Sequence, residues 1–309
     1  MGYIIGMDGG GTKTRCAVSA PSGEIVYKTN GGSANFLIHG TEKVSENIFN
    51  LIEDCRNNLK MDYSVISAVL LGTAGAGRKK HAQKLEEDFN SYCLKKNIKI
   101  IFFHVESDAR IALEGAFSGG PGCILIAGTG SIILGKDDAG NILRAGGFGR
   151  LIGDEGGGYS TGRKALQAVS KSFDNRAEGT LLKKLLETNF GINSPDTLIT
   201  EVYEKNLDIA AVAPFVLQAA EQGDAAAVKI IDEETDELLL LVSSMLKRLS
   251  KNHVKLSLIG GLIDKENYFA NKLRQKISSV FSEVELHKPD FAPEVGAVLL
   301  ARELLKLNS

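Results

Sequence analysis

The sequence of 309 residues contains no tryptophan, and aromatic side chains make up only 6% of it. This scarcity argues against a lectin-like surface on which sugar rings stack. Charge of one sign is not in excess either: 36 basic and 38 acidic residues leave a net charge of −2. We therefore expect neither nucleic acid nor another polyanion as a partner.

Long apolar runs are also missing. The longest, Leu238 to Val242, is far shorter than a membrane span. The first residues carry no basic segment and reach an acid at Asp8, so no signal peptide is readable. The sequence thus predicts a cytoplasmic protein with no membrane segment.

Cysteines are few and widely spaced. Cys16, Cys55, Cys93 and Cys123 form no C-x-x-C pair and have no histidine at ligand spacing. We expect buried free thiols, and we do not expect a zinc or iron–sulfur site within one chain.

Strands and helices alternate along the first part of the chain, which predicts an α/β sheet. The expected strands are 3–7, 14–20, 24–29, 68–71 and 99–104. The expected helices run from about Thr41, a candidate N-cap, to Cys55, and over 79–96. The second part is mostly helical, with expected helices at 162–172, 181–188, 207–222, 225–249 and from about Glu294, and one strand at 255–259.

The opening pattern of strand, glycine turn and strand occurs twice. A shift of 117 positions places Gly11 on Gly128, Thr12 on Thr129, Gly23 on Gly140 and Ile25 on Ile142. We interpret this as a duplicated fold with two lobes, residues 1–117 and 118–309, and a cleft between them. We expect the second lobe to carry a helical insertion and the last helix to pack back on the first lobe. Asp8 has no acidic counterpart, because the shift places it on Leu125.

The first glycine turn follows a strand in "IIGMDGGGTKT", residues 4–14. Successive amides of such a turn can bind a phosphate, although glycine pairs also make plain hairpins. Lys13 comes one place too late for a P-loop, and no dinucleotide fingerprint is present. Asp8, at the end of the strand, can hold Mg²⁺ through water or cap the turn.

Other candidate residues also have ordinary structural explanations. Asp108 opens a helix and is placed as an N-cap. Asn35 in "SANF" suits a turn, and Asp154 with Glu155 suits a helix N-terminus. The pair Gly260-Gly261 suits a turn between a strand and a helix. "GTAGAG", residues 72–77, resembles a third phosphate loop.

Taken in order, "IIGMDGGGTKT", "LIAGTGS", "GGFGRLIGDEGGGYSTGRKAL" and "LSLIGG" resemble the phosphate-1, phosphate-2, connect and adenosine motifs of the actin/hexokinase/Hsp70 superfamily. Within it, the chain resembles the N-acetylglucosamine kinase branch of the BadF/BadG/BcrA/BcrD ATPase family over almost its whole length. The resemblance implies a two-lobed, ribonuclease H-like α/β fold with duplicated halves. It also implies ATP and Mg²⁺ as cofactors.

The resemblance assigns roles residue by residue. It implies that Asp108 is the general base, accepting the proton of the sugar hydroxyl, and that Asp8 faces Mg²⁺. The nucleotide contacts that it implies are Asp8, Gly10, Gly11, Thr12, Lys13, Gly128, Thr129, Gly130, Gly260 and Gly261. The substrate contacts are Asn35, Asp108, Ser131, Gly147, Phe148, Gly149 and Asp154. Ala74 and Gly75 are candidate neighbours of the substrate, and "EQGD" at 221–224 resembles a segment near the nucleotide.

Phe148 and Arg150 depart from the usual family pattern, which has Trp and His at these positions. Arg150 can therefore pair a substrate carboxylate, such as the lactyl group of N-acetylmuramic acid, or face solvent.

The implied activity is transfer of a phosphoryl group from ATP to the 6-hydroxyl of N-acetylglucosamine or N-acetylmuramic acid, by a homodimer. Alternatives are a glucosamine kinase, an ATP-driven activator of a radical dehydratase, or a non-catalytic sugar sensor. The activators hold an iron–sulfur cluster with closely placed cysteines, and the sensors usually carry an N-terminal helix-turn-helix; neither feature is readable here.

Overall fold

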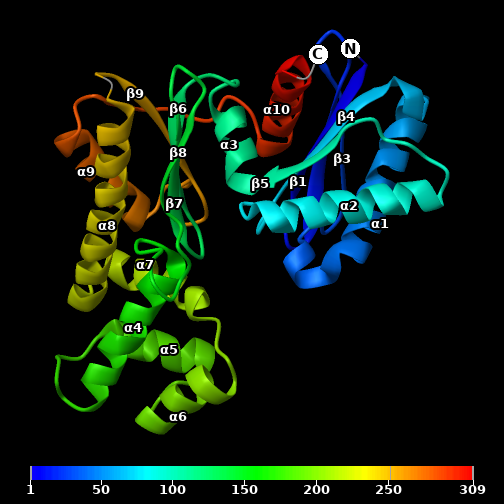
Figure 1. Cartoon of the computed structure of the whole chain (residues 1–309). Helices are drawn as coiled ribbons and strands as arrows, with labels where there is room; N and C mark the ends of the chain where they lie inside the picture. The colour runs from blue at the N-terminus through cyan, green and yellow to red at the C-terminus, as the bar shows by residue number, and fades with distance from the viewer. Residues whose placement is uncertain (1, 251, 308–309) are drawn as a thin grey trace. The chain divides into compact units, whose positions relative to one another are not determined.

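The computed structural model describes residues 2–250 and 252–307, and these fall into two units. The first unit contains Met1–Pro121 and Lys288–Ser309, and the second contains Gly122–His287. The last helix, α10 (Pro293–Leu307), therefore belongs to the first unit, where it packs on α3 (Asp108–Ala116) and β1 (Tyr3–Gly9). Each unit is built on one five-stranded sheet (Figure 1).

The sheet of the first unit has the order β3-β2-β1-β4-β5. Its strands are β1 (Tyr3–Gly9), β2 (Lys13–Ser19), β3 (Ile25–Gly32), β4 (Ile66–Thr73) and β5 (Phe103–Ser107). The first three form the expected antiparallel meander, and β4 and β5 run parallel to β1. The last strand was expected at 99–104; it lies later, because residues 96–102 form a turn and an irregular connection.

Helices cover both faces of this sheet. On one face, α1 (Phe36–Leu59) and α2 (Lys79–Lys95) pack against Ile5 and Met7. On the other, α10 and α3 (Asp108–Ala116) pack against Ile4 and its neighbours. Because β1 is buried on both faces, it reads as a continuous apolar run. A short 3-10 turn, Tyr63–Val65, precedes β4.

The second unit repeats the topology of the first. Its sheet has the order β10-β9-β6-β7-β8, with β6 (Gly122–Ala127), β7 (Ser131–Lys136), β8 (Ile142–Gly146), β9 (Val254–Ile259) and β10 (Val284–Leu286). Here β6, β7 and β8 form the antiparallel meander, while β9 and β10 are parallel to β6. The same arrangement in both units is what a duplicated fold requires.

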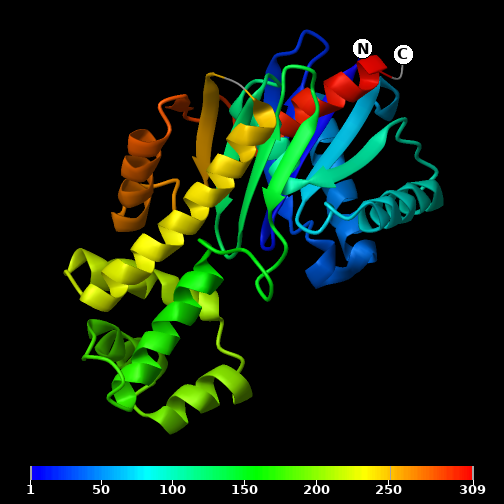
Figure 2. The same cartoon turned by 60° about the vertical axis from the view of Figure 1, so that its left-hand side comes forward.

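One long helix of the insertion between β8 and β9 packs on this second sheet. In Figure 2 the long helix α8 (Ala225–Leu249) runs beside it, in contact with β7, β8 and α9 (Tyr268–Val280). The other elements of the insertion are α4 (Gly158–Phe173), α5 (Leu181–Phe190), α6 (Pro195–Ile199), a π-turn (Thr200–Glu204), a 3-10 turn (Ile209–Val212) and α7 (Ala213–Glu221). The helix expected over 207–222 thus divides into a 3-10 turn and a shorter α-helix.

All four cysteines are buried and free, as expected. The Sγ atoms of Cys16 and Cys55 lie 3.6 Å apart in the core of the first unit, and their contact and burial hold the pKa of the Cys16 thiol well above its ordinary value. Buried, protonated thiols are poor ligands for a surface cluster. In the described part of the chain, no helix is both long and apolar enough to cross a bilayer.

Candidate active site

The first glycine turn links β1 to β2 and is exposed from Gly10 to Lys13. The amide of Gly10 donates to the Lys13 carbonyl at 3.0 Å, which closes the turn. Among residues 2–250 and 252–307, no group accepts a hydrogen bond from the amides of Gly11 or Thr12. These two donors are therefore available to an anion, as a phosphate nest requires.

Asp8 and Asp108 belong to one edge of the first sheet. Asp8 lies beside Gly72 on β4, and Thr73 on β4 lies beside Ser107, the last residue of β5. Asp108 comes directly after that strand. The carboxyl ends of parallel strands are where ligands bind in open α/β sheets.

Electrostatics at this edge favour a bound cation. Burial raises the pKa of the Asp8 carboxyl, and the negative charges of Glu294 and Asp108 raise it further, against the opposing effect of Arg15. Arg15 Nη1 lies 3.3 Å from Asp8 Oδ2. Glu294, in the first turn of α10, is buried, and its Oε1 lies 3.8 Å from Lys28 Nζ. Its Oε2 has no hydrogen-bond partner among the described residues.

Asp108 is the first residue of α3 and is exposed. The prediction that it caps the helix is wrong, because Ser107 is the N-cap and its Oγ accepts from the Arg110 amide at 3.2 Å. Within the part of the chain that the structure describes, Asp108 Oδ1 accepts only from the next amide, that of Ala109, at 2.8 Å. Because the Asp108 carboxylate does not cap the helix, its other oxygen can accept a hydrogen bond from a substrate hydroxyl.

Asn35 is the N-cap of α1, with Oδ1 accepting from the Leu37 amide at 3.1 Å. The expected cap, Thr41, instead donates to Asp88 from a point where the helix is broken at Gly40. Leu37 packs over Gly75 of the "GTAGAG" loop. Asn35 and this loop therefore lie near one another in the first unit.

The second glycine turn links β6 to β7. The amide of Gly128 donates to the Gly130 carbonyl at 2.9 Å, and the amides of Gly158 and Tyr159, which open α4, donate to the carbonyls of Gly128 and Thr129. Ser131 Oγ donates to the Glu155 carbonyl. The turn is thereby tied to the N-terminus of α4, which favours an anion.

The loop that contains Asp154 lies against this turn. Asp154 has a positive φ of 63°, and its Oδ1 accepts from the Gly149 amide at 3.0 Å. A Cβ on Gly130 would lie 2.2 Å from Asp154 Oδ2, so the carboxylate touches the turn. Gly147 also has a positive φ, 70°, and Phe148 is 71% exposed. The loop therefore presents an aromatic ring and a carboxylate from the same short segment.

Glu234 holds this loop and was not predicted. It is fully buried in α8, and its two carboxylate oxygens accept from the Gly156 amide and, at 2.8 Å, from Ser160 Oγ. Lys164 Nζ lies 2.9 Å from Glu234 Oε1. In the sequence, Glu234 stands within the acidic run "DEETDE", so only its burial distinguishes it.

Gly260 lies beside the second glycine turn, at the end of β9. Its φ is 109°, and a Cβ on it would lie 2.4 Å from the carbonyl oxygen of Ala127. Gly261 has open space around its Cα and is exposed. Only glycine fits at position 260, which leaves the backbone at 261 open to a flat ring.

Arg150 does not extend freely into solvent. Its guanidinium carbon lies 5.2 Å from the centre of the Tyr159 ring, a cation–π arrangement. The residue stays exposed, so a substrate carboxylate can still reach it.

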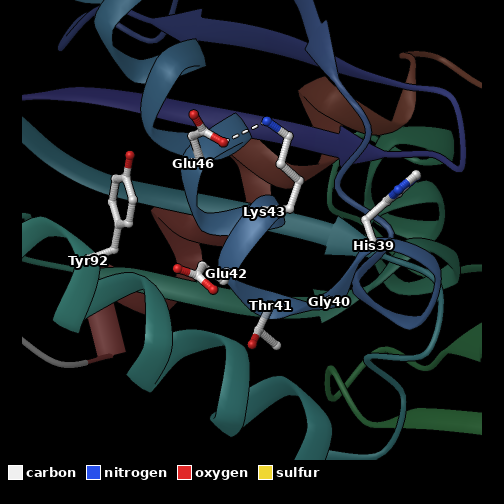
Figure 3. Close-up of a pocket in the computed structure, with 7 residues that line it drawn as sticks. All are labelled: His39, Gly40, Thr41, Glu42, Lys43, Glu46 and Tyr92. Atoms are coloured by element: carbon white, nitrogen blue, oxygen red, sulfur yellow. Dashed lines mark hydrogen bonds and ion pairs between the residues drawn. The ribbon is translucent and has the colours of Figure 1, made fainter.

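The first unit thus contains Asp8, Gly10, Gly11, Thr12, Lys13, Asn35 and Asp108, and the second contains Gly128, Thr129, Gly130, Ser131, Gly147, Phe148, Gly149, Asp154, Gly260 and Gly261. A separate open hollow of about 680 Å³ lies at the start of α1, next to Tyr92 of α2 (Figure 3). It is lined by His39, Gly40, Thr41, Glu42, Lys43, Glu46 and Tyr92, none of which is an expected site residue.

The duplicated α/β fold and its two glycine turns are those of the actin-like sugar kinases. A solved structure of a Chromobacterium violaceum protein assigned as an N-acetylglucosamine kinase aligns with a TM-score of 0.75 at 23% identity, covering 97% of this chain and 99% of that one. A ROK family glucokinase from Streptomyces griseus, solved with glucose and AMPPNP, aligns at 0.57 and 18% identity, covering 98% of this chain and all of that one. At these identities the likeness concerns the fold.

The chain belongs to the BadF/BadG/BcrA/BcrD ATPase family, whose model matches residues 5–301. It is 33% identical to an N-acetylmuramic acid/N-acetylglucosamine kinase of Clostridium acetobutylicum over 98% of this chain and 99% of that protein. It is 27% identical to an N-acetyl-D-glucosamine kinase of Dictyostelium discoideum, over 96% of this chain and 97% of that protein. The family predicted from the sequence motifs is confirmed.

Proposed function

We propose that the protein is an ATP-dependent amino-sugar kinase that phosphorylates the 6-hydroxyl of N-acetylglucosamine, and of N-acetylmuramic acid. One observation carries this proposal. The Asp108 carboxylate, which does not cap its helix, lies at the same edge of the first sheet as an exposed glycine turn with free amides. The likeness to a Clostridium kinase that is named for both sugars supports the substrate class.

The glycine turns are assigned to ATP. The amides of Gly11 and Thr12, with the Lys13 ammonium, bind phosphate oxygens, and the turn from Gly128 to Gly130 binds phosphate in the same way. Gly260 and Gly261 take the adenosine. Phosphoryl transfer needs positioning and charge stabilisation above all, and these donors supply both.

Asp108 acts as the general base. As the 6-oxygen of the sugar attacks the γ-phosphorus, Asp108 takes the hydroxyl proton, the bond from that phosphorus to the bridging oxygen breaks, and ADP leaves. Asn35, Ser131, Gly147, Phe148, Gly149 and Asp154 hold the sugar. We assign to Arg150 the pairing of the lactyl carboxylate of N-acetylmuramic acid, which N-acetylglucosamine lacks; its exposure supports this assignment.

The residues present fit Mg²⁺ at Asp8. The buried Oε2 of Glu294, which has no hydrogen-bond partner among the described residues, adds negative charge near Asp8. Burial also raises the free energy of the ionised Asp8 carboxylate, and a cation beside it would lower that free energy. In the described residues no three histidine, cysteine or acidic side chains converge as direct ligands. Asp8 would therefore hold Mg²⁺ through its water shell, which is its usual mode. When bound, Mg²⁺ neutralises developing charge on the phosphates.

A coupled assay of ADP release with N-acetylglucosamine, N-acetylmuramic acid, glucosamine and glucose tests the proposal. Release with the two N-acetylated sugars supports it, and release with glucosamine alone would favour the glucosamine kinase instead. No release with any amino sugar would refute the kinase function and favour a sugar sensor. We also propose a homodimer that works in the cytoplasm, where ATP is available; light scattering in solution tests the oligomeric state.

A further inference from the structure

The carbonyl groups of the first glycine turn are held by the segment that follows β3. Ser33 Oγ donates to the Gly10 carbonyl at 2.9 Å, and the ring Nε2 of His39 lies 3.4 Å from the Gly11 carbonyl oxygen. The hydroxyl of Thr73 bridges the carbonyls of Gly9 and Ala34, at 3.1 Å and 3.0 Å. The carbonyls of Gly10 and Gly11 in the turn are therefore held by residues 33–39 directly, and that of Gly9, at the end of β1, is held through Thr73. We call residues 33–40 the Asn35 segment.

Asn35 is at the centre of this segment. Its amide donates to Ser33 Oγ at 3.2 Å, and its carbonyl accepts from the amides of Ile38 and His39. The hydroxyl of Ser33 thus joins the backbone of Asn35 to the Gly10 carbonyl. A displacement of Asn35 is passed to the glycine turn by this one hydroxyl.

Gly40 separates the segment from the rest of α1. Its φ of 75° and ψ of 161° interrupt the helix, and this region of backbone angles is open to glycine almost alone. A Cβ at Gly40 would have no neighbour within 4 Å, so packing does not fix the break. The segment is therefore a single capped turn, set off from the long helix.

The inner side of the segment is packed, because Ser33, Ala34 and Phe36 are buried, whereas its outer side is open. Leu37 is 59% and Ile38 is 64% exposed, and Ile38 lies next to Gly11. Figure 3 shows His39 pointing away from the ion pair of Lys43 and Glu46. The exposed half of the segment, residues 37–40, has few buried contacts, as do the parts of a protein that a ligand can order most strongly.

We propose that the Asn35 segment couples sugar binding to nucleotide binding, with Ser33 and His39 as positioning residues that act through the carbonyls of Gly10 and Gly11. This inference rests on the proposed function, because it takes Asn35 as a sugar contact. A sugar held by Asn35 orders the segment, the segment fixes the glycine turn, and the amides of Gly11 and Thr12 then meet the phosphates without further ordering. The coupling is reciprocal, so bound nucleotide also tightens the sugar.

Calorimetry measures this coupling directly. The affinity of the Mg²⁺ complex of AMPPNP is determined without sugar and with a saturating amount of the sugar that gives ADP release. In the wild-type protein we expect the sugar to tighten AMPPNP at least about fivefold. In Ser33→Ala and in His39→Ala we expect the factor to fall below about twofold, because one carbonyl of the turn is released. His39→Gln, which keeps a side-chain donor, retains most of the factor.

Ser91→Ala is the matched control. It too removes a serine hydroxyl that donates to a carbonyl, that of Glu87, but on the exposed side of α2, and it leaves the coupling unchanged. Circular dichroism verifies that each variant is folded. If Ser33→Ala does not fold, the exposed His39 carries the test.

The outcomes separate the inference from the proposed function. If wild-type protein phosphorylates a sugar but the sugar changes AMPPNP affinity less than twofold, the inference is wrong and the kinase function stands. Full coupling in both Ser33→Ala and His39→Ala also overturns it. If no sugar is phosphorylated or bound, the proposed function fails, and the inference fails with it.

Discussion

Replacing Glu234 tests how the Asp154 loop is held in place. In Glu234→Ala, the buried amide of Gly156 loses its acceptor, and Ser160 Oγ and Lys164 each lose one partner. A buried donor left unpaired costs about 1–3 kcal/mol. Lys164 keeps Glu233 at 2.8 Å, so its charge is not stranded.

Together these losses give about 3–5 kcal/mol of destabilisation, which is also the range measured when one partner of a buried ion pair is removed. Urea unfolding followed by circular dichroism measures the change in free energy. We further expect the KM for the sugar to rise roughly tenfold, because the loop that carries Asp154 is no longer anchored and a cost of about 1.4 kcal/mol is a factor of ten.

Glu233→Ala is the natural control. Glu233 is the neighbouring residue, its side chain is 46% exposed, and it too contacts Lys164. An exposed ion pair of this kind contributes about 0–1 kcal/mol. If Glu234→Ala costs no more than Glu233→Ala, the assignment of Glu234 as the anchor of the loop is refuted.

Two further predictions concern the backbone and the pH dependence. Gly260→Ala combines a positive φ with overlap of the Ala127 carbonyl, so it should cost about 2–4 kcal/mol in urea unfolding and weaken AMPPNP in calorimetry, whereas Gly179→Ala, in open space, should do neither. Glu86, whose Oε1 lies 2.8 Å from His104 Nδ1, raises the pKa of His104 above its ordinary value of 6.5. The charged pair therefore stabilises the fold fully below pH 6.5, and this stabilisation is lost as the pH rises through the folded pKa. His104→Gln should flatten unfolding free energy against pH in that window; an unchanged profile would contradict the assignment.

The sequence predicted best those elements whose conformation is determined by residues close together in the chain. The apolar run of β1, the glycine turns and the capped helix α8 all follow from neighbouring residues. The duplication could be predicted because the same glycine turn occurs twice in the sequence. The structure agrees with it, since both sheets have the same strand order. The late start of β5 was not predictable, because residues 100–102 are as apolar as those of a strand and only pairing with β4 selects 103–107.

Caps and buried charges were the weak points of the prediction. Asp108 and Thr41 are good N-cap residues in isolation, but Ser107 and Asn35 take those roles because the chain enters each helix earlier. Glu234 could not be selected from an acidic run on a helix, since its partners lie more than 70 residues away. Such residues are defined by packing, which no local pattern records.

The central claim, that Asp108 is the base of a sugar kinase, is tested by one comparison of ADP release. Asp108→Asn keeps the size of the side chain and removes the proton acceptor. The matched control is Asp62→Asn, because Asp62 is exposed and its side chain makes no capping hydrogen bond to the 3-10 turn that it precedes. With N-acetylglucosamine we expect Asp108→Asn to lower kcat by about 10²–10⁴-fold while AMPPNP binding is retained, and Asp62→Asn to behave as wild type. A kcat for Asp108→Asn above about one per cent of wild type would contradict the account.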